Sequence, residues 1–478
     1  MLGLPLPEPA ANPAAMRYQS TRGAAPLLGF RDVTLAGLAS DGGLYVPEAW
    51  PSLTRDQIAD LAGLSYVETA VRVMLPFVGP DLSEDELRDL CTQAYGRFSH
   101  AAVTPLVQLD HQHWLLELFH GPTLAFKDVA LQLLGLLFEK FLAGSGDHLT
   151  IVGATSGDTG SAAIDAVAGR AGIDIFMLHP KGRVSDVQRR QMTTVLAPNV
   201  HNIAIEGSFD DAQAMVKALF NDRDFTTRFR LSAVNSINWA RLMAQVVYYF
   251  YAAVRLGAPA QKVAFAVPTG NFGDVFAGYV AARMGLPVER LVVATNVNDI
   301  LHRALANGDY SAGTVTPTAA PSMDIQVSSN FERLLFDLAG ASVADQMAGF
   351  ESSKAMRLTN AQQQGAAKIF ASDRITPEEM SETMRWASAE AAQVIDPHTA
   401  IGLAAARRAD IPADVPVVTL ATAHPAKFAD AVERATGMRP GLPARVGDLF
   451  DRQERYEVLP GTLDAVRDYI TGIAKPRA

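Results

Sequence analysis

Cysteine is almost absent from this sequence, because Cys91 is the only one among 478 residues. A single thiol excludes an intrachain disulfide, and it also excludes a zinc site built from several cysteines. Proteins with so few cysteines are typical of reducing compartments, so the expected location is the cytoplasm.

The chain also lacks an excess of positive charge and a long apolar run. Its 41 basic and 51 acidic residues give a net charge of -10, which offers no general attraction to nucleic acid or to an anionic membrane. The densest apolar stretch, residues 129–138, ends at Glu139 and Lys140 and is shorter than the ~20 residues needed to cross a bilayer. We therefore expect no nucleic-acid partner and no membrane span, and we interpret residues 129–138 as a buried helix.

The first fifteen residues contain neither a basic segment nor a continuous apolar segment, so they do not resemble a secretory signal. We expect residues 1–15 to be a disordered extension that activity does not require. The remaining chain is long enough for two or three domains, and its 49% hydrophobic content predicts a large core.

Two segments repeat the order strand, glycine-bearing turn, helix and strand. The first has strands at 149–152 and 173–178 around a helix at 161–168, and the second has strands at 263–267 and 291–294 around a helix at 275–284. A further strand is expected at 417–420, and the acid-rich residues 83–90 predict a helix in a separate N-terminal region. This alternation predicts an α/β fold with parallel sheets that helices cover on both faces.

Lys127 follows a Gly121-Pro122 turn and begins the apolar helix. Partial desolvation there would lower the pKa of its amine and make it nucleophilic enough to form a Schiff base. The alternative is a solvated lysine paired with Asp128, and without other motifs this alternative is favoured.

Three other segments could bind anions. The turn 270–274 has two glycines before a helix, which suits a phosphate, although it could be a plain βα turn. The segment 153–160 is rich in hydroxyl groups that could hold a carboxylate, whereas helix capping by Ser156 or Asp158 explains only part of it. The segment 235–241 precedes a long amphipathic helix that runs to about residue 254. It could hold a second phosphate through Arg241, and capping beside a surface arginine is the alternative.

A metal site at His111, His113 or His398 lacks a further ligand motif, so we expect none.

In this order, these four segments resemble the fold type II pyridoxal-phosphate (PLP) enzymes, and more closely the threonine synthase family. The blocks 17–23, 40–47, 396–400 and 422–428 also resemble signatures of that family. The resemblance covers residues 17–428, and it implies two open, mostly parallel sheets flanked by helices, with an additional N-terminal domain. It divides the chain into an N-terminal domain, 16–100, a large PLP-binding domain, 101–148 and 256–478, and a small domain, 149–255.

The resemblance also implies a role for each candidate residue. Lys127 would form the Schiff base with PLP and move protons, and Thr422 would face the pyridine nitrogen. Ser156 and Thr159 would hold the substrate carboxylate, and Asp158, in the same loop, would lie near the 3-hydroxyl of the ring. The cofactor phosphate would be bound through the backbone amides of Gly270, Asn271, Phe272, Gly273 and Asp274, and the substrate phosphate by Asn235, Ser236, Asn238 and Arg241.

The implied reaction converts O-phospho-L-homoserine and water to L-threonine and phosphate, in a monomer or homodimer. The nearest alternatives are a related PLP-dependent phospho-lyase and a serine or threonine dehydratase, which would share Lys127 and the cofactor turn. A dehydratase has no substrate phosphate to hold, so residues 235–241 favour the first reaction. A non-catalytic descendant is a further alternative, although such a protein would be expected to have lost the lysine.

Overall fold

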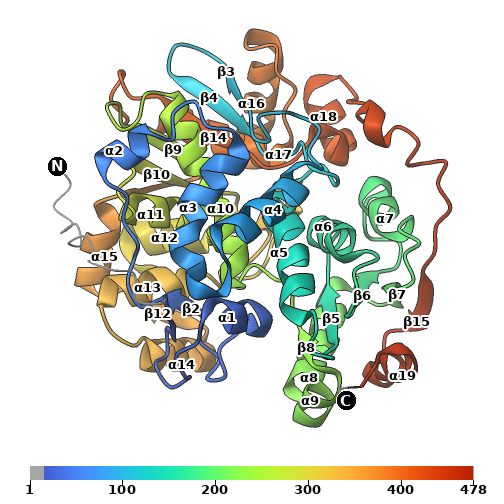
Figure 1. The fold of residues 1–478 in the computed structure, drawn as a ribbon. Coiled ribbons are helices and arrows are strands. Elements are labelled where there is room, and N and C mark those ends of the chain that lie inside the picture. The colour runs from blue at the N-terminus through green and yellow to red at the C-terminus, as the bar shows by residue number, and fades with distance from the viewer. Residues whose placement is uncertain (1–15, 477–478) are drawn as a thin grey trace.

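The computed structural model describes residues 16–476. Within them lie a six-stranded sheet and a five-stranded sheet, with helices packed between and around them, and two small two-stranded sheets (Figure 1). The extension expected at residues 1–15 lies outside the described residues, so its disorder stays a prediction. No helix of the described part is long and apolar enough to span a bilayer.

The N-terminal region is a layer of helices with one antiparallel pair of strands. Thr54 and Ser83 each form a capping box, with Gln57 and Glu86 respectively, and Ser83 begins the helix expected at 83–90. In this layer α3 packs against α10 (Trp239–Arg255) and α4 packs against α5 (Lys127–Leu142), so the region is joined to the rest of the protein through buried helix faces. The elements are β1 (Tyr18–Ser20), α1 (Phe30–Ala36), β2 (Tyr45–Pro47), α2 (Arg55–Ala59), α3 (Tyr66–Val78), η1 (Gly79–Asp81) and α4 (Glu84–Tyr95).

The larger sheet has six strands in the order β13-β10-β9-β14-β4-β3. All neighbours in it are parallel except β3 and β4, which form an antiparallel edge. The strands are β3 (Leu106–Gln108), β4 (His113–Glu117), β9 (Val263–Pro268), β10 (Val288–Thr295), β13 (Phe370–Arg374) and β14 (Val417–Ala421).

Helices cover this sheet and bury its β-branched strands. The helix α17 lies against β14 and β9, and α11 lies against β10 and β9. A small pair of strands, β11 and β12, is added beside α12 and α14. The elements are α10 (Trp239–Arg255), α11 (Gly273–Arg283), α12 (Ile300–Asn307), β11 (Asp309–Ser311), η2 (Pro321–Met323), α13 (Phe331–Ala339), α14 (Ala344–Ser353), β12 (Ala355–Arg357), α15 (Asn360–Ala367), α16 (Pro377–Glu390), α17 (Pro397–Arg408), η3 (Pro425–Phe428), α18 (Ala429–Thr436) and η4 (Ala444–Val446).

The smaller sheet has five parallel strands in the order β15-β7-β6-β5-β8. The helix α5, which follows β4 of the larger sheet, packs against α6, which follows β5 of the smaller sheet, so the two sheets meet through these helices. The elements are α5 (Lys127–Leu142), β5 (Leu149–Ala154), α6 (Asp158–Val167), β6 (Ile173–Pro180), α7 (Asp186–Thr193), β7 (Val200–Glu206), α8 (Phe209–Asn221), α9 (Arg223–Phe229), β8 (Leu231–Ser232), β15 (Glu457–Pro460) and α19 (Leu463–Ile473).

The predicted α/β fold with two mostly parallel sheets is confirmed, and both βαβ segments lie where the sequence places them. The division into domains differs at two places. Residues 457–460 pair with β7 of the small sheet, although the large domain was expected to continue to residue 478. The helix α10, expected inside the small domain, packs against α3, α5 and α11 instead.

The helix α10 lies where the sequence places an amphipathic helix, but its polar side is buried as well as its apolar side. It is buried along almost its whole length because α3, α5 and α11 enclose it (Figure 1). Trp239 at its first turn contacts the rings of Tyr18 and Phe77. A helix that is buried all round is a core element, and this one brings its N-terminal end to the candidate site.

Candidate active site

Lys127 is the first residue of α5, at the end of the turn that follows β4. Its side chain is 10% exposed, and its amine lies 3.5 Å from the carboxylate of Asp158. Asp128 is not its ion-pair partner, because that carboxylate accepts hydrogen bonds from the backbone N–H and the hydroxyl of Thr123, both at 2.7 Å. Asp128 therefore fixes the turn, and Lys127 points to another element of the protein.

The same turn is attached to the end of β14, where Thr422 lies. The backbone N–H of Phe126 donates to the carbonyl of Thr422 at 2.8 Å, and His424 N–H donates to the carbonyl of Leu124 at 3.0 Å. Thr422 is 6% exposed. The backbone of Thr422 is thus joined to Phe126, the residue before Lys127.

Asp158 begins α6 and is the anion at the centre of the site. Its carboxylate lies 2.8 Å from the amine of Lys427 and accepts a hydrogen bond from Gln188 at 2.8 Å. Burial opposes ionisation of this carboxyl, but the charges of Lys427 and Lys127 hold the pKa of Asp158 below its ordinary value. Asp158 is therefore a carboxylate at neutral pH.

The amine of Lys127 is set by the charges around it. Burial lowers the pKa of Lys127, Asp158 opposes that shift, and the positive charges of Lys427 and Arg241 add to it. The net direction is downward, which raises the fraction of free amine near neutral pH and suits a nucleophile.

The turn 270–274 lies between β9 and α11. Phe272 has a φ of 62°, in the left-handed region, and no side chain caps the helix that begins at Gly273. The first N–H groups of a helix lack partners within it and attract anions. The carboxylate of Asp274 instead accepts hydrogen bonds from Tyr248 and Tyr249, and burial raises its pKa to about 6. Both tyrosines donate to Oδ1, and Oδ2 has no hydrogen-bond partner among the described residues. Since a carboxylate repels phosphate, the group of Asp274 that suits a phosphate is its backbone N–H.

Gly270 is expected to be intolerant of a side chain. A Cβ atom there would lie 2.6 Å from the carbonyl oxygen of Ser322, so Gly270→Ala must displace the turn. We expect the affinity for PLP to fall about tenfold or more, since a misplaced turn loses hydrogen bonds to phosphate. Titration of the apoprotein with PLP, followed by absorbance, measures the change.

Gly349→Ala in α14 is the matched control, because nothing lies within 4 Å of a Cβ atom there. This variant should keep the affinity for PLP of the unmodified protein. Equal affinities in the two variants would contradict the requirement for glycine at position 270.

The segment 235–241 lies against the turn 270–274. The side-chain amide of Asn330 joins them, because it donates both to the carbonyl of Ser236, at 3.2 Å, and to the carbonyl of Asn271, at 3.0 Å. Asn235 is exposed, and its side chain accepts a hydrogen bond from the backbone of Ile237 at 3.3 Å. The two predicted phosphate-binding segments are thus neighbours.

Arg241 and Asn238 of this segment differ in what they can offer a ligand. Arg241 is 4% exposed and donates to the carbonyl of Val234, but its Nε has no hydrogen-bond partner among the described residues. Burial lowers the pKa of Arg241 to about 10. Asn238 caps α10 by accepting from Ala240 N–H and donates to the carbonyl of Thr34, so its amide is already engaged by the fold. Arg241 is therefore the group available to an incoming anion.

The hydroxyl groups expected to bind a carboxylate lie around the start of α6. The hydroxyl of Thr155 accepts hydrogen bonds from the N–H groups of Gly157 and Gly160, both at 2.9 Å, so it stabilises the loop. Ser156 is exposed and Thr159 is half-buried, and neither side-chain hydroxyl has a hydrogen bond within residues 16–476. Ser156 and Thr159 are thus free to bind a ligand.

These features fit PLP. The amine of Lys127 is available for a covalent bond to the aldehyde, and the helices α5, α6 and α11 all begin without a side-chain cap. The N–H groups at these uncapped helix N-termini can bind anions, and so can the guanidinium of Arg241, which forms no ion pair with a carboxylate within residues 16–476. Together they are enough to bind two phosphates and a carboxylate. Thr422 adds a buried hydroxyl-bearing side chain next to the turn that leads to Lys127.

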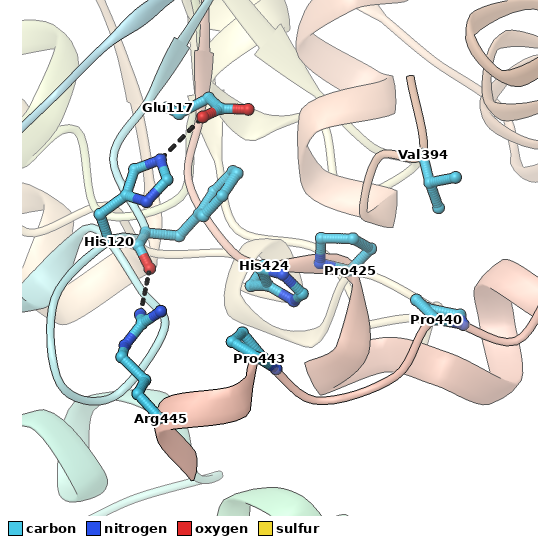
Figure 2. Close-up of a pocket in the computed structure, with 9 residues that line it drawn as sticks. Glu117, His120, Val394, His424, Pro425, Pro440, Pro443 and Arg445 are labelled. Carbon is cyan, nitrogen blue, oxygen red and sulfur yellow. Dashed lines mark hydrogen bonds and ion pairs between the residues drawn. The ribbon is translucent and has the colours of Figure 1, made fainter. Parts of the chain in front are cut away.

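A cavity of about 460 Å³ borders the turn before Lys127. Figure 2 shows His120 beside Glu117, and Arg445 beside the backbone of the same turn, where it also donates to the carbonyl of Gly121 at 2.9 Å. Burial and the charge of Arg445 lower the pKa of His424 to about 4, so its ring is neutral near pH 7. The cavity is lined by Glu117, Phe119, His120, Val394, His424, Pro425, Pro440, Pro443 and Arg445.

Three family models match successive parts of the chain. The model described as the N terminus of threonine synthase matches residues 17–95, the model of pyridoxal-phosphate dependent enzymes matches residues 98–361, and the model of the threonine synthase C-terminal part matches residues 399–470. A threonine synthase of Pseudomonas aeruginosa is 55% identical over 460 residues, which cover 95% of this chain and 98% of that protein. The chain belongs to the threonine synthase family.

Solved structures agree with this membership. The PLP-bound threonine synthase of Brucella melitensis superposes with a TM-score of 0.94 at 52% identity, and the match covers 96% of this chain and 100% of that one. The yeast threonine synthase structure has a TM-score of 0.91 at 39% identity, covering 96% and 99%. The protein is thus a PLP-dependent enzyme of fold type II within the threonine synthase family.

The sequence motifs assigned no role to three residues that lie in this site, namely Lys427, Gln188 and Asn330. Lys427 lies inside the 422–428 block that resembles the family, but nothing in the block indicated that its amine turns toward Asp158. Gln188, in α7, donates a hydrogen bond to Asp158, which lies 30 residues earlier in the chain. Asn330, just before α13, donates to the carbonyl of Ser236, which lies 94 residues earlier. The surrounding motif was a signal for Lys427 only.

Proposed function

We propose that the protein converts O-phospho-L-homoserine and water to L-threonine and phosphate. The observation that supports this substrate is the buried, uncompensated guanidinium of Arg241 in the same site as Lys127. A buried cation without an anionic partner is costly unless a ligand supplies the charge. A substrate phosphate does so, whereas serine and threonine carry none.

The residues divide the work between binding and proton transfer. PLP, when bound, supplies an electron sink for negative charge on the substrate carbons. Lys127 takes a proton from the substrate α carbon, since its amine is the base nearest the cofactor. A further proton leaves Cβ, which supplies the electron pair for the departure of phosphate from Cγ, and Lys127 returns protons later. Ser156, Thr159 and the first turn of α6 hold the substrate carboxylate. The N–H groups of residues 270–274 hold the cofactor phosphate.

The phosphate of the substrate is held by Arg241 with Asn235 and Ser236. Arg241 stabilises the charge that grows on the phosphate as it leaves Cγ, and water then adds at Cβ to give threonine. Asn238 positions these groups as the cap of α10. Asp158 lies near the 3-hydroxyl of the cofactor ring as a carboxylate.

The test is a product assay of the PLP-loaded protein with O-phospho-L-homoserine. Threonine and inorganic phosphate should appear in equal amounts, because each turnover releases one of each. Formation of a keto acid with ammonia in place of threonine would contradict the proposal and favour a lyase or dehydratase activity.

Compartment and assembly are proposed on more general grounds. A chain with one cysteine, Cys91, which is buried and free, suits the reducing cytoplasm. The expected monomer or homodimer is a prediction that light scattering of the purified protein tests.

A further inference from the structure

Lys427 is a second lysine buried beside Lys127. Its side chain is 0% exposed, and its amine contacts two oxygen atoms, the Asp158 carboxylate at 2.8 Å and the Thr123 carbonyl at 2.8 Å. Lys127 lies 3.5 Å from the other oxygen of the same carboxylate. One carboxylate therefore lies between two amines, and Lys427 has the shorter contact and the additional hydrogen bond.

The charges facing Lys127 do not balance two ammonium groups. Asp158 from α6 is the only carboxylate that forms an ion pair with Lys127 within residues 16–476. Arg241 from α10 adds a positive charge. Asp274 from α11 also faces Lys127, and burial raises the pKa of that carboxyl to about 6. Its Oδ1 atom accepts hydrogen bonds from Tyr248 and Tyr249. With Asp158 and Asp274 both ionised near neutral pH, two carboxylates would face two ammonium groups and one guanidinium, so the positive charges still outnumber the negative ones.

We propose that Lys427 is a positioning residue that occupies Asp158 and keeps a positive charge beside Lys127, so that Lys127 meets the cofactor as a free amine. The inference rests on the proposed role of Lys127 in holding PLP. Lys427 also donates a hydrogen bond to the carbonyl of Thr123, in the turn before Lys127. The same side chain therefore holds the turn that carries the Lys127 amine and acts on the charge of that amine.

The step that Lys427 favours is the covalent attachment of PLP. The nitrogen of Lys127 bonds to the aldehyde carbon, the carbonyl oxygen leaves as water, and the two hydrogens of the neutral amine leave with it. Only the unprotonated amine has the electron pair for this bond, so attachment depends on the fraction of Lys127 that is free amine at a given pH.

The test measures the rate of PLP attachment to the apoprotein as a function of pH. Absorbance follows attachment, and borohydride reduction with peptide mass analysis identifies the lysine. For Lys427→Gln we expect the pH profile to move upward by about one unit or more, because Asp158 is then left to stabilise the Lys127 ammonium alone. Lys427→Arg should restore most of the original profile, because it keeps the positive charge.

Asp158→Asn tests the same arrangement from the other side. Without that carboxylate the Lys127 ammonium loses its partner, so we expect the pH profile to move downward. A purely structural role of Lys427 predicts slower attachment in Lys427→Gln without a shift of its pH profile, and it predicts no recovery of the profile in Lys427→Arg. Lys262→Gln, which removes a half-exposed lysine paired with Glu289, is the control and should leave the profile unchanged.

The outcomes separate this inference from the proposed function. Attachment of PLP to a lysine other than Lys127 in the unmodified protein would refute the proposed site itself. Attachment to Lys127 with the same pH profile in Lys427→Gln would overturn only the role of Lys427. If circular dichroism shows that Lys427→Gln does not fold, Lys427→Met, which keeps an unbranched side chain without the charge, replaces it, and an unchanged pH profile in that variant would overturn the inference.

Discussion

Replacing Lys127 with alanine should abolish the covalent retention of PLP and lower turnover by about 10³-fold or more. The size of the effect follows from the loss of two functions at once, the covalent attachment and the proton transfer. The neighbouring amine of Lys427 is 0% exposed and is held by Asp158 and Thr123, so it is not free to replace Lys127. Absorbance of the purified variant after dialysis, and threonine formation from O-phospho-L-homoserine, measure the two losses.

Lys262→Ala is the matched control for this variant. Lys262 forms an ion pair with Glu289 at the surface, where such pairs contribute little to stability, so its absorbance and turnover should stay normal. A Lys127→Ala protein that kept the visible band of attached PLP would contradict the assignment of Lys127.

Replacing Arg241 with glutamine should raise the KM for O-phospho-L-homoserine about 100-fold or more. Removing one partner of a buried, hydrogen-bonded charge pair typically costs ~2–5 kcal/mol, and the phosphate would lose the one buried guanidinium placed to bind it. The apoprotein, by contrast, should be at least as stable as before, because the charge that is removed has no carboxylate partner within the described chain. Steady-state kinetics and thermal unfolding of the apoprotein measure the two effects.

Arg333 provides the comparison, because it is also buried but each of its guanidinium nitrogens donates a hydrogen bond within the protein. Its guanidinium donates to the carbonyl of Tyr45, to the side chain of Asn330 and to the carbonyl of Ile237. Arg333→Gln should therefore lower the melting temperature, whereas Arg241→Gln should not. If Arg241→Gln weakened PLP binding and left the KM unchanged, Arg241 would serve the cofactor phosphate instead.

Local sequence patterns predicted the parts of the fold that depend on nearby residues. The apolar run before the 270–274 turn is β9, and the acid-rich segment 83–90 belongs to α4, which Ser83 caps. In both places the signal and the structure lie within a few residues of each other. The same holds for the site, since Lys127, residues 270–274 and Arg241 belong to motifs whose chemistry is visible in the chain itself.

Features set by distant partners could not be predicted in this way. The strand β8 has two residues and is defined by its pairing with β5, and β15 has a largely exposed pattern that shows no alternation. The engagement of Asn238 by Thr34 depends on a contact across 204 residues. Likewise, whether Lys427 or Asp128 lies next to Lys127 is decided by how η3 and α6 pack, and no spacing rule contains that information.

The pairing of β15 with β7 has a consequence for the order in which the protein matures. Ile203 and Glu457 become register partners only after 254 further residues have been made, so the edge of the small sheet stays open during most of synthesis. A nascent chain halted before residue 457 would expose an unpaired β7 edge, which is a site for aggregation. The small sheet, which carries Asp158 at the start of α6, should therefore reach its final form only after β15 has been made.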